Sequence, residues 1–219
     1  MNKKSKLIWW LLLIVVVCCW LWQGYSSPQH NLASWSAYSI GGKPVPVTFD
    51  SGDVVTLKIP TPSDRIQCVA FLTKPLVADL TSKTITATIS IVESGIPNYR
   101  ICLVSLCTEP ANVRLYFSDV AGAYSLTSAN RNQTQYWWAD FAFVNMGNGM
   151  FTLTAPLDGS LWSDSQGVSG ADEPGAFATA ARNSQQVGFA FGSCFWDVGF
   201  GLADNNGSST LHVLSFTIQ

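Results

Sequence analysis

The sequence predicts an all-β fold: an antiparallel β-sandwich with one short helix, preceded by an N-terminal hydrophobic helix. Two observations predict it. Short runs in which apolar and polar residues alternate recur along the chain and are separated by turn residues. Beyond the N-terminus, only one stretch has helical spacing. Because strands without alternating helices favour antiparallel pairing, we expect two packed antiparallel sheets.

The clearest predicted strand is 83–92, in which Thr or Ser alternates with an apolar residue over 84–91. One face of this strand is therefore expected to be buried and the other exposed. Near the C-terminus the alternation changes phase between Val213 and Leu214, which a β-bulge would explain. The other predicted strands are 54–59, 66–72, 113–117, 135–145, 150–155, 186–191 and 210–218.

The predicted helix follows Asp172, which can act as its N-cap. Glu173 and Pro174 are typical of a first turn. Phe177 and Ala181 lie four residues apart and share one face of such a helix. This face is expected to cover an edge or an end of the sandwich.

The N-terminus has the features of an export signal. Lys3, Lys4 and Lys6 precede an unbroken apolar run over 7–22, bracketed by tryptophans that suit a membrane interface. An uncleaved membrane anchor is favoured over cleavage after Ser26, and a lipoprotein signal is the third alternative. We therefore expect a signal peptide or anchor at 1–26, a linker at 27–45 and the sandwich at 46–219, with the domain exported beyond the membrane.

The composition excludes some partners. Without residues 1–26, nine basic residues stand against fourteen acidic ones, a formal net charge of -5. A domain with this charge is not expected to bind nucleic acid.

Four cysteines follow the membrane segment: Cys68, Cys102, Cys107 and Cys194. In an oxidising compartment an even number favours disulfides. We expect Cys102 to pair with Cys107 across a short loop, and Cys68 with Cys194. Buried free thiols are the alternative.

Strand 135–145 carries the candidate binding residues. Trp137, Phe141 and Phe143 share one side of a regular strand, and they are assigned to the core. The opposite side of this strand is then exposed. The same alternation of inward and outward residues, applied to strand 113–117, places its second and fourth residues on the exposed side. The resulting candidate sugar-contacting face consists of Arg114, Tyr116, Tyr136, Trp138 and Asp140, because aromatic rings pack on sugar rings while charged groups bond hydroxyls. Ordinary packing of these rings under the helix or loops is the alternative.

Two further tryptophans, Trp162 and Trp196, lie in Gly-, Ser- and Asp-rich segments, where large aromatic residues often serve binding. No cofactor is expected. A structural Ca²⁺ would find oxygen ligands at Asp50, Asp53, Asp197 and Asp204, although no calcium-loop spacing is present.

The order of several segments resembles the galactose-binding-like jelly rolls of non-catalytic carbohydrate-binding modules and of related exported bacterial proteins. The similar segments include Tyr136-Trp-Trp, Phe151-Thr-Leu-Thr-Ala-Pro-Leu, Leu161-Trp-Ser-Asp and Val187-Gly-Phe-Ala-Phe-Gly. The resemblance covers roughly residues 46–219. It implies a jelly-roll fold and a glycan, or another cell-envelope component, as the partner.

Enzyme motifs are absent from the sequence: it contains no G-x-S-x-G, H-E-x-x-H or Walker loop. The favoured function is a non-catalytic carbohydrate-binding module at the cell surface or in the periplasm. A structural or assembly protein of the envelope is the second alternative, and a glycan-active hydrolase is the third.

Overall fold

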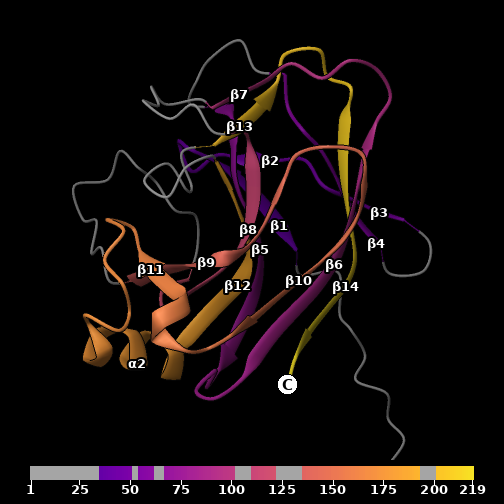
Figure 1. Cartoon of the computed structure of the whole chain (residues 1–219). Helices are drawn as coiled ribbons and strands as arrows, with labels where there is room; N and C mark the ends of the chain where they lie inside the picture. Colours follow the sequence, from indigo (N-terminus) through magenta and orange to yellow (C-terminus); the bar gives the residue numbers. More distant parts are fainter. Residues whose placement is uncertain (1–34, 51–53, 62–66, 102–109, 122–134, 193–200) are drawn as a thin grey trace, which may run out of the picture. The chain divides into compact units, whose positions relative to one another are not determined.

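The computed structural model describes residues 35–50, 54–61, 67–101, 110–121, 135–192 and 201–219. Its strands form two antiparallel sheets, accompanied by a helix (Figure 1), which confirms the predicted β-sandwich. The predicted hydrophobic segment at 7–22 lies outside these residues. Within the described ranges, no helix has the length and apolar character needed to cross a bilayer.

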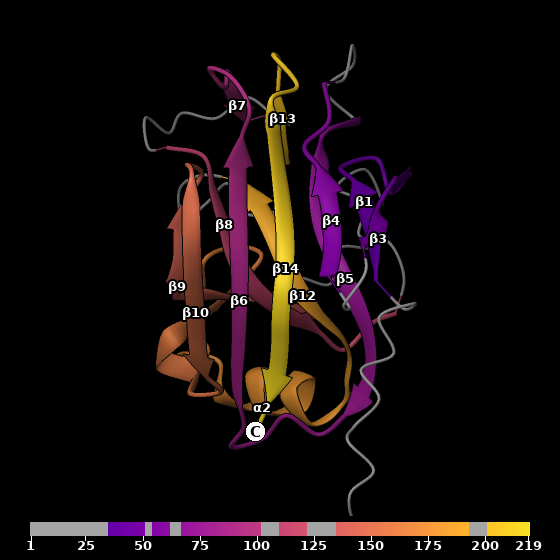
Figure 2. The same ribbon diagram turned by 90° about the vertical axis from the view of Figure 1, so that its right-hand side faces the viewer.

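Sheet B faces the viewer in Figure 2. Its central strand pair is β6 and β14, which are antiparallel over almost their full lengths. The order across the sheet is β10 (Gly149–Pro156), β6 (Thr84–Glu93), β14 (Ser209–Ile218), β4 (Val54–Lys58) and β3 (Thr48–Asp50). The alternation predicted for 83–92 is present in β6, where the apolar residues are buried.

Sheet A is the second layer of the sandwich, and its edge strands are short. The order is β11 (Trp162–Asp164), β9 (Tyr136–Asn145), β8 (Asn112–Ser118), β12 (Ser184–Gly192), β5 (Val69–Ala78), β1 (Ser36–Ser39) and β2 (Pro44–Val45). In addition, β13 (Leu202–Asp204) pairs with β5 and with β7 (Tyr99–Ile101).

The expected linker at 27–45 reaches into the sandwich, because β1 and β2 belong to sheet A. Trp35 is buried and stacks on Phe189 of β12 at a ring-centroid distance of 5.9 Å. The turn-rich composition of this stretch concealed a short hairpin, in which Ala37 pairs with Val45.

The main core lies between the two sheets. Phe189 also contacts Phe216 of β14, with their ring centroids 5.8 Å apart, so the aromatic packing bridges both layers. The predicted bulge in the last strand is present: the register of β14 against β6 shifts between Val213 and Ser215. The shift turns Phe216 inward after the inward-facing Val213, which explains the change of phase in the sequence.

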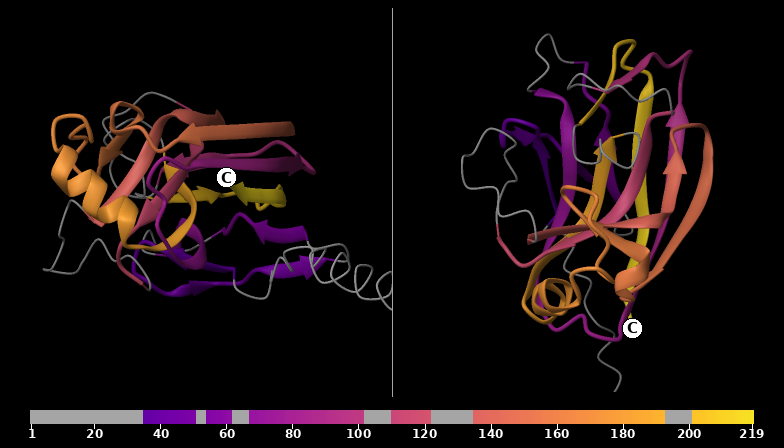
Figure 3. Two further views of the ribbon diagram at one scale, coloured as in Figure 1. Left: turned by 90° about the horizontal axis from the view of Figure 1, so that it is seen from below. Right: turned by 60° about the vertical axis from the view of Figure 1, so that its left-hand side comes forward.

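Helix α2 (Pro174–Arg182) lies at the end of the sandwich where the chain terminates (Figures 1 and 3). Phe177, Ala180 and Ala181 are its buried residues, as its spacing predicts. The N-cap is Glu173, one residue later than the expected Asp172, and its side chain makes no capping hydrogen bond. A short 3-10 turn, η4 (Gly159–Leu161), precedes β11.

Candidate functional site

The outer face of sheet A, which is turned away from sheet B, carries the residues predicted to form the site. Strand register places Trp138 of β9 opposite Tyr116 of β8, and Tyr116 opposite Gly188 of β12. The neighbouring Trp137 and Phe117 point the other way, into the core. Arg114, Tyr116, Tyr136, Trp138 and Asp140 therefore share one face, as the sequence predicts.

The centre of this outer face is nevertheless buried, contrary to the expected exposure. Only 1% of Tyr116 and 2% of Trp138 is accessible to solvent. The ring of Phe71 packs edge-on against that of Tyr116 at 4.9 Å. Ala190 of β12 belongs to the same buried group of residues. Trp138 and Tyr116 thus belong to a second hydrophobic cluster, not to an open binding platform.

Burial has consequences for the polar atoms of this cluster. It raises the pKa of the Tyr116 hydroxyl above its usual value, although a hydrogen bond with Thr73 opposes this effect. Burial likewise raises the pKa of Tyr136 to about 12. The indole Nε1 of Trp138 finds no hydrogen-bond partner in the part of the chain that the structure describes. An unpaired buried donor of this kind is costly.

Phe141 and Phe143 lie on the outer side of sheet A, whereas the sequence predicts them in the core. Both were assigned to the core, yet 75% of Phe141 and 40% of Phe143 is exposed. The cause is an irregularity in the pairing of β9 with β8. On β8, one residue lies between Arg114 and Tyr116. On β9, four residues lie between their partners, Phe143 and Trp138. This irregularity changes the parity of β9, so that both phenylalanines lie on the outer side.

Arg114 connects the two halves of β9. Its guanidinium carbon lies 4.6 Å from the centroid of the Phe143 ring, and its Nη1 donates to the backbone oxygen of Asp140 at 3.3 Å. Its Nε donates to Asn112 at 3.4 Å. Only 3% of Arg114 is exposed, so its contacts hold it in place. We call Arg114, Asp140, Phe141 and Phe143 the β9 platform.

Asp140 supplies the carboxylate of the β9 platform. Its Oδ1 accepts a hydrogen bond of 2.6 Å from the Ser163 hydroxyl on β11. Burial raises the pKa of Asp140, while the bond from Ser163 and the charge of Arg114 oppose the increase. The platform therefore combines accessible aromatic carbon with an oriented carboxylate and a planar cation.

Of the two tryptophans predicted in Gly-, Ser- and Asp-rich segments, the structure describes Trp162. Trp162 lies in β11 and is fully buried in the main core, where its ring is 5.0 Å from that of Phe117. Its Nε1 donates to the Pro156 carbonyl at 2.7 Å, so its polar atom is satisfied. Trp162 therefore presents no surface to a ligand. Trp196 lies outside the described residues.

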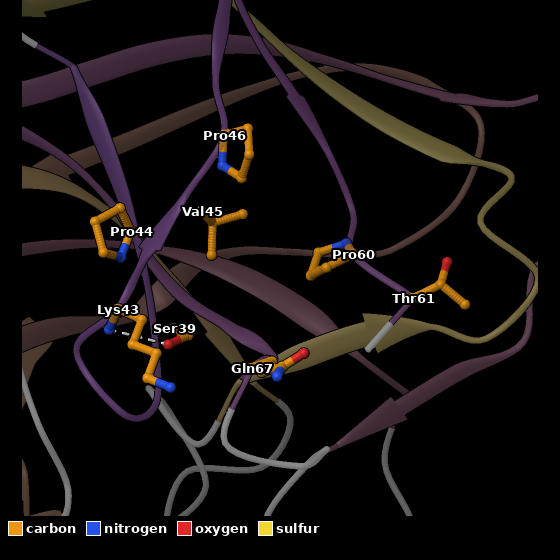
Figure 4. A pocket seen from close by; sticks show the side chains of 8 residues that line it. All are labelled: Ser39, Lys43, Pro44, Val45, Pro46, Pro60, Thr61 and Gln67. Carbon is orange, nitrogen blue, oxygen red and sulfur yellow. Dashed lines mark hydrogen bonds between the residues drawn. The ribbon is translucent and has the colours of Figure 1, made fainter. Parts of the chain in front are cut away.

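A pocket that the sequence did not indicate lies beside the β1–β2 turn (Figure 4) and has a volume of about 300 Å³. Its lining is Ser39, Lys43, Pro44, Val45, Pro46, Pro60, Thr61 and Gln67. The turn is held by hydrogen bonds between Ser39 and Lys43, including one of 3.1 Å from the Lys43 amide to the Ser39 hydroxyl. Because these residues fall at the expected linker and in a proline-rich connection, the sequence pattern offered no signal for the pocket.

No cluster of metal-ligating side chains occurs among the described residues. Of the four aspartates considered for Ca²⁺, Asp53 and Asp197 lie outside the described ranges. Asp50 accepts from the Thr56 hydroxyl at the edge of sheet B. Asp204 is fully buried, and it accepts hydrogen bonds from the backbone and side chains of its own turn.

Cys68 is fully buried on the outer face of sheet A and is disulfide-bonded. Every other cysteine lies outside the described residues. The expected pairings of Cys68 with Cys194 and of Cys102 with Cys107 therefore stay predictions.

No known protein family matches the chain, and a search of curated proteins finds no match. Several solved structures are similar to it. They include xylanase 10C of Cellvibrio japonicus in complex with xylopentaose (13% identity, TM-score 0.41), a family 4 carbohydrate-binding module (13%, 0.34) and the metal-free carbohydrate recognition domain of Emp46p (9%, 0.40). The similar region covers 85%, 89% and 88% of this chain, respectively.

The chain spans only 27% of the xylanase, but 92% of the binding module and 91% of the recognition domain. With identities of 13% or less and TM-scores below 0.5, these similarities assign no function to the chain.

Proposed function

We propose that this chain is an exported, non-catalytic carbohydrate-binding protein that holds a sugar ring on the β9 platform. The supporting observation is the accessible ring pair Phe141 and Phe143, beside the oriented groups of Arg114 and Asp140. An aromatic face packs on the apolar face of a pyranose, and a carboxylate accepts hydrogen bonds from its hydroxyls. This proposal moves the sugar contact from Trp138 and Tyr116 to Phe141 and Phe143.

The same site gives no support to hydrolysis. Cleavage of a glycosidic bond usually needs two carboxyl groups facing each other across the bond. Among the described residues, the charged group that acts on the Asp140 carboxyl is the guanidinium of Arg114. We therefore assign Asp140 a binding role.

A glycan array probed with the full chain in detergent, against a detergent blank, tests the proposal. Selective binding to one glycan class is expected. If the array is blank while wild-type protein is folded, carbohydrate binding is refuted.

One observation favours the second candidate function, an assembly role in the envelope. β11 pairs with β9 only over residues 137–139. Within the described chain, β9 beyond Ala139 therefore has a strand neighbour on one side alone, next to the exposed Phe141. A free strand edge with an adjacent apolar side chain suits strand addition by another protein.

Export belongs to the proposal as well and rests on the N-terminal lysines and apolar run. We expect the sandwich to lie on the far side of a membrane, anchored by residues 7–22 or released by cleavage after Ser26. Fractionation of cells together with N-terminal mass spectrometry distinguishes these forms. A soluble protein with an intact N-terminus would contradict both.

A further inference from the structure

Strand β10 forms one edge of sheet B, where it lies beside β6 (Figure 2). It pairs with β6 along all eight of its residues, without a shift of register. Within the part of the chain that the structure describes, no strand pairs with its other side. Natural proteins usually protect such an edge, because its unpaired N–H and C=O groups are a template for another strand.

The usual protections are absent from β10. The strands that end the sheets elsewhere in the described ranges are two or three residues long, and they are β2, β3, β7 and β11. In contrast, β10 has eight residues and contains no Lys, Arg, Asp or Glu, and its only proline is its last residue, Pro156. A long, uncharged edge without a bulge favours pairing with a further strand.

Hydrogen bonds just beyond the two ends of β10 show which of its backbone groups bond to β6. The Leu157 amide donates to the Lys83 carbonyl at 2.8 Å. At the other end the Glu93 amide of β6 also points toward the β10 side, where it donates to the side chain of Asn148 at 2.7 Å. In an antiparallel pair, the N–H and C=O of one residue point to the same side, and the side alternates along the strand. The odd-numbered residues of β10 therefore bond to β6.

The even-numbered residues turn their backbone groups toward the free edge. Met150, Thr152 and Thr154 each present one N–H and one C=O there. All three residues are exposed, and 69% of Met150 is accessible to solvent. Pro156 adds no free group, because it lacks an N–H and its oxygen already accepts from the Trp162 Nε1 at 2.7 Å. The edge therefore offers three residues that can each donate and accept.

A second copy of the same strand fits this edge. Two antiparallel copies are related by a two-fold axis, and an axis through Thr152 places this residue opposite Thr152 of the second copy. Met150 then lies opposite Thr154 of the second copy, and Thr154 lies opposite its Met150. Every free N–H and C=O of both edges finds a partner in this register. An axis through Leu153 would instead place Met150 opposite Pro156, whose missing N–H leaves the Met150 oxygen unpaired.

The side chains of β10 agree with an axis through Thr152. On the core side, the half-buried Phe151 lies opposite Leu153 of the second copy, so apolar residues meet. On the outer side the two Thr152 residues meet, and cross-strand Thr pairs stabilise antiparallel sheets. A strand without charges can face its own copy without repulsion, and it offers no charge that would select a different protein.

We propose that two copies of this chain associate through β10 and join their sheets B into one continuous sheet. The contact is symmetric about Thr152. It is independent of the sugar contact on the β9 platform, which lies on the outer face of sheet A.

Sedimentation equilibrium of the full chain in density-matched detergent tests the proposal. The wild-type protein is expected to dimerise reversibly. Thr152→Pro removes the central N–H of each copy and places two proline rings at the axis, but it breaks no hydrogen bond to β6. This variant is therefore expected to be folded and monomeric.

The matched control is Asn145→Pro on β9, whose second half also has a free side. The N–H of Asn145 points away from β8, because the next residue, Met146, donates its own N–H to the Ala111 oxygen of the β8 side at 2.8 Å. Asn145→Pro is expected to dimerise like the wild type.

A charge exchange at the axis tests the register. Thr152→Lys and Thr152→Glu each place like charges opposite one another, and both are expected to weaken the dimer. An equimolar mixture of the two is expected to associate roughly 5-fold more tightly than either variant alone. This comparison keeps the proposal testable should thermal melts show that Thr152→Pro is unfolded.

A wild-type protein that stays monomeric up to about 1 mM overturns the proposal. A dimer that persists in folded Thr152→Pro, or that is lost in folded Asn145→Pro, is held at another surface and overturns it as well. If the mixture associates no more tightly than either charged variant, the two copies do not meet at Thr152.

Discussion

Arg114 and Phe143 come from neighbouring strands, and the guanidinium carbon of Arg114 lies 4.6 Å from the centroid of the Phe143 ring. This contact exists only because the irregularity in β9 brings Phe143 to the outer side, opposite Arg114. A planar guanidinium stacks well on an aromatic face, and burial of Arg114 together with its hydrogen bonds holds this stack in place. The pair thus fixes one half of the β9 platform before any ligand arrives.

The first prediction concerns Trp138 and Trp137, which lie on opposite faces of β9. Because both are almost fully buried, replacing either by Ala should reduce the free energy of unfolding by about 3–5 kcal/mol. Chemical denaturation of the two variants measures this loss. A Trp138→Ala protein as stable as wild type would show that this ring lies at an open surface.

The second prediction concerns Gly188 in the middle of β12. Its φ is 155°, and a Cβ built there would lie 2.1 Å from the backbone oxygen of Leu72. Gly188→Ala must therefore push β12 away from β5, and we expect a clear fall in the melting temperature. Gly147→Ala is the matched control, since its Cβ meets nothing within 4 Å. Equal melting temperatures for the two variants would contradict the close strand contact.

The third prediction concerns the pH dependence of stability through Asp204. Burial by itself raises the pKa of this carboxyl, but hydrogen bonds outweigh burial and bring its pKa to about 2. The donors are the backbone amides of Asn98, Asn206 and Ser208 and the hydroxyls of Ser208 and Ser209.

Because the folded pKa lies below the ordinary value of 3.8, Asp204 stabilises the fold above about pH 4. That contribution is lost as the pH falls from 4 toward 2. Thermal melts of wild type and Asp204→Asn over this range should converge, with the variant less stable at pH 7. If the two proteins differ in melting temperature by the same amount at every pH, Asp204 does not contribute to the pH dependence of stability.

The fourth prediction concerns the disulfides. Cys68 is disulfide-bonded in the structure, and we expect its partner to be Cys194, with Cys102 joined to Cys107. Peptide mapping under non-reducing conditions identifies both links directly. A peptide in which Cys68 is joined to Cys102 would disprove both pairings at once.

Strict alternation made much of the fold predictable from the sequence. In β6 and β14 the apolar residues recur at every second position, and the phase change at Val213 marked a real bulge. The hairpin of β1 and β2 was not predictable, because strands of two to four residues leave too short a pattern. Its turn residues therefore resembled a linker.

In β9, the assumption that successive residues of a strand face opposite sides holds only for the first half of the strand. Trp137 and Trp138 fall on the predicted faces because they precede the irregularity in β9. Phe141 and Phe143 follow it, and nothing in the local sequence shows that three extra residues are accommodated there. The burial of Tyr116 was equally hidden, since it depends on Phe71, which is distant in sequence.

The exposed ring of Phe141 provides the most direct test of the carbohydrate-binding proposal. Calorimetry should compare wild type and Phe141→Ala for the glycan that the array identifies, with Phe49→Ala as the control for an exposed phenylalanine on sheet B. We predict that Phe141→Ala weakens binding by about 1–2 kcal/mol, roughly 5- to 30-fold in Kd, while Phe49→Ala leaves it unchanged. Equal affinities of wild type and Phe141→Ala, with both proteins folded, would contradict sugar binding on the β9 platform.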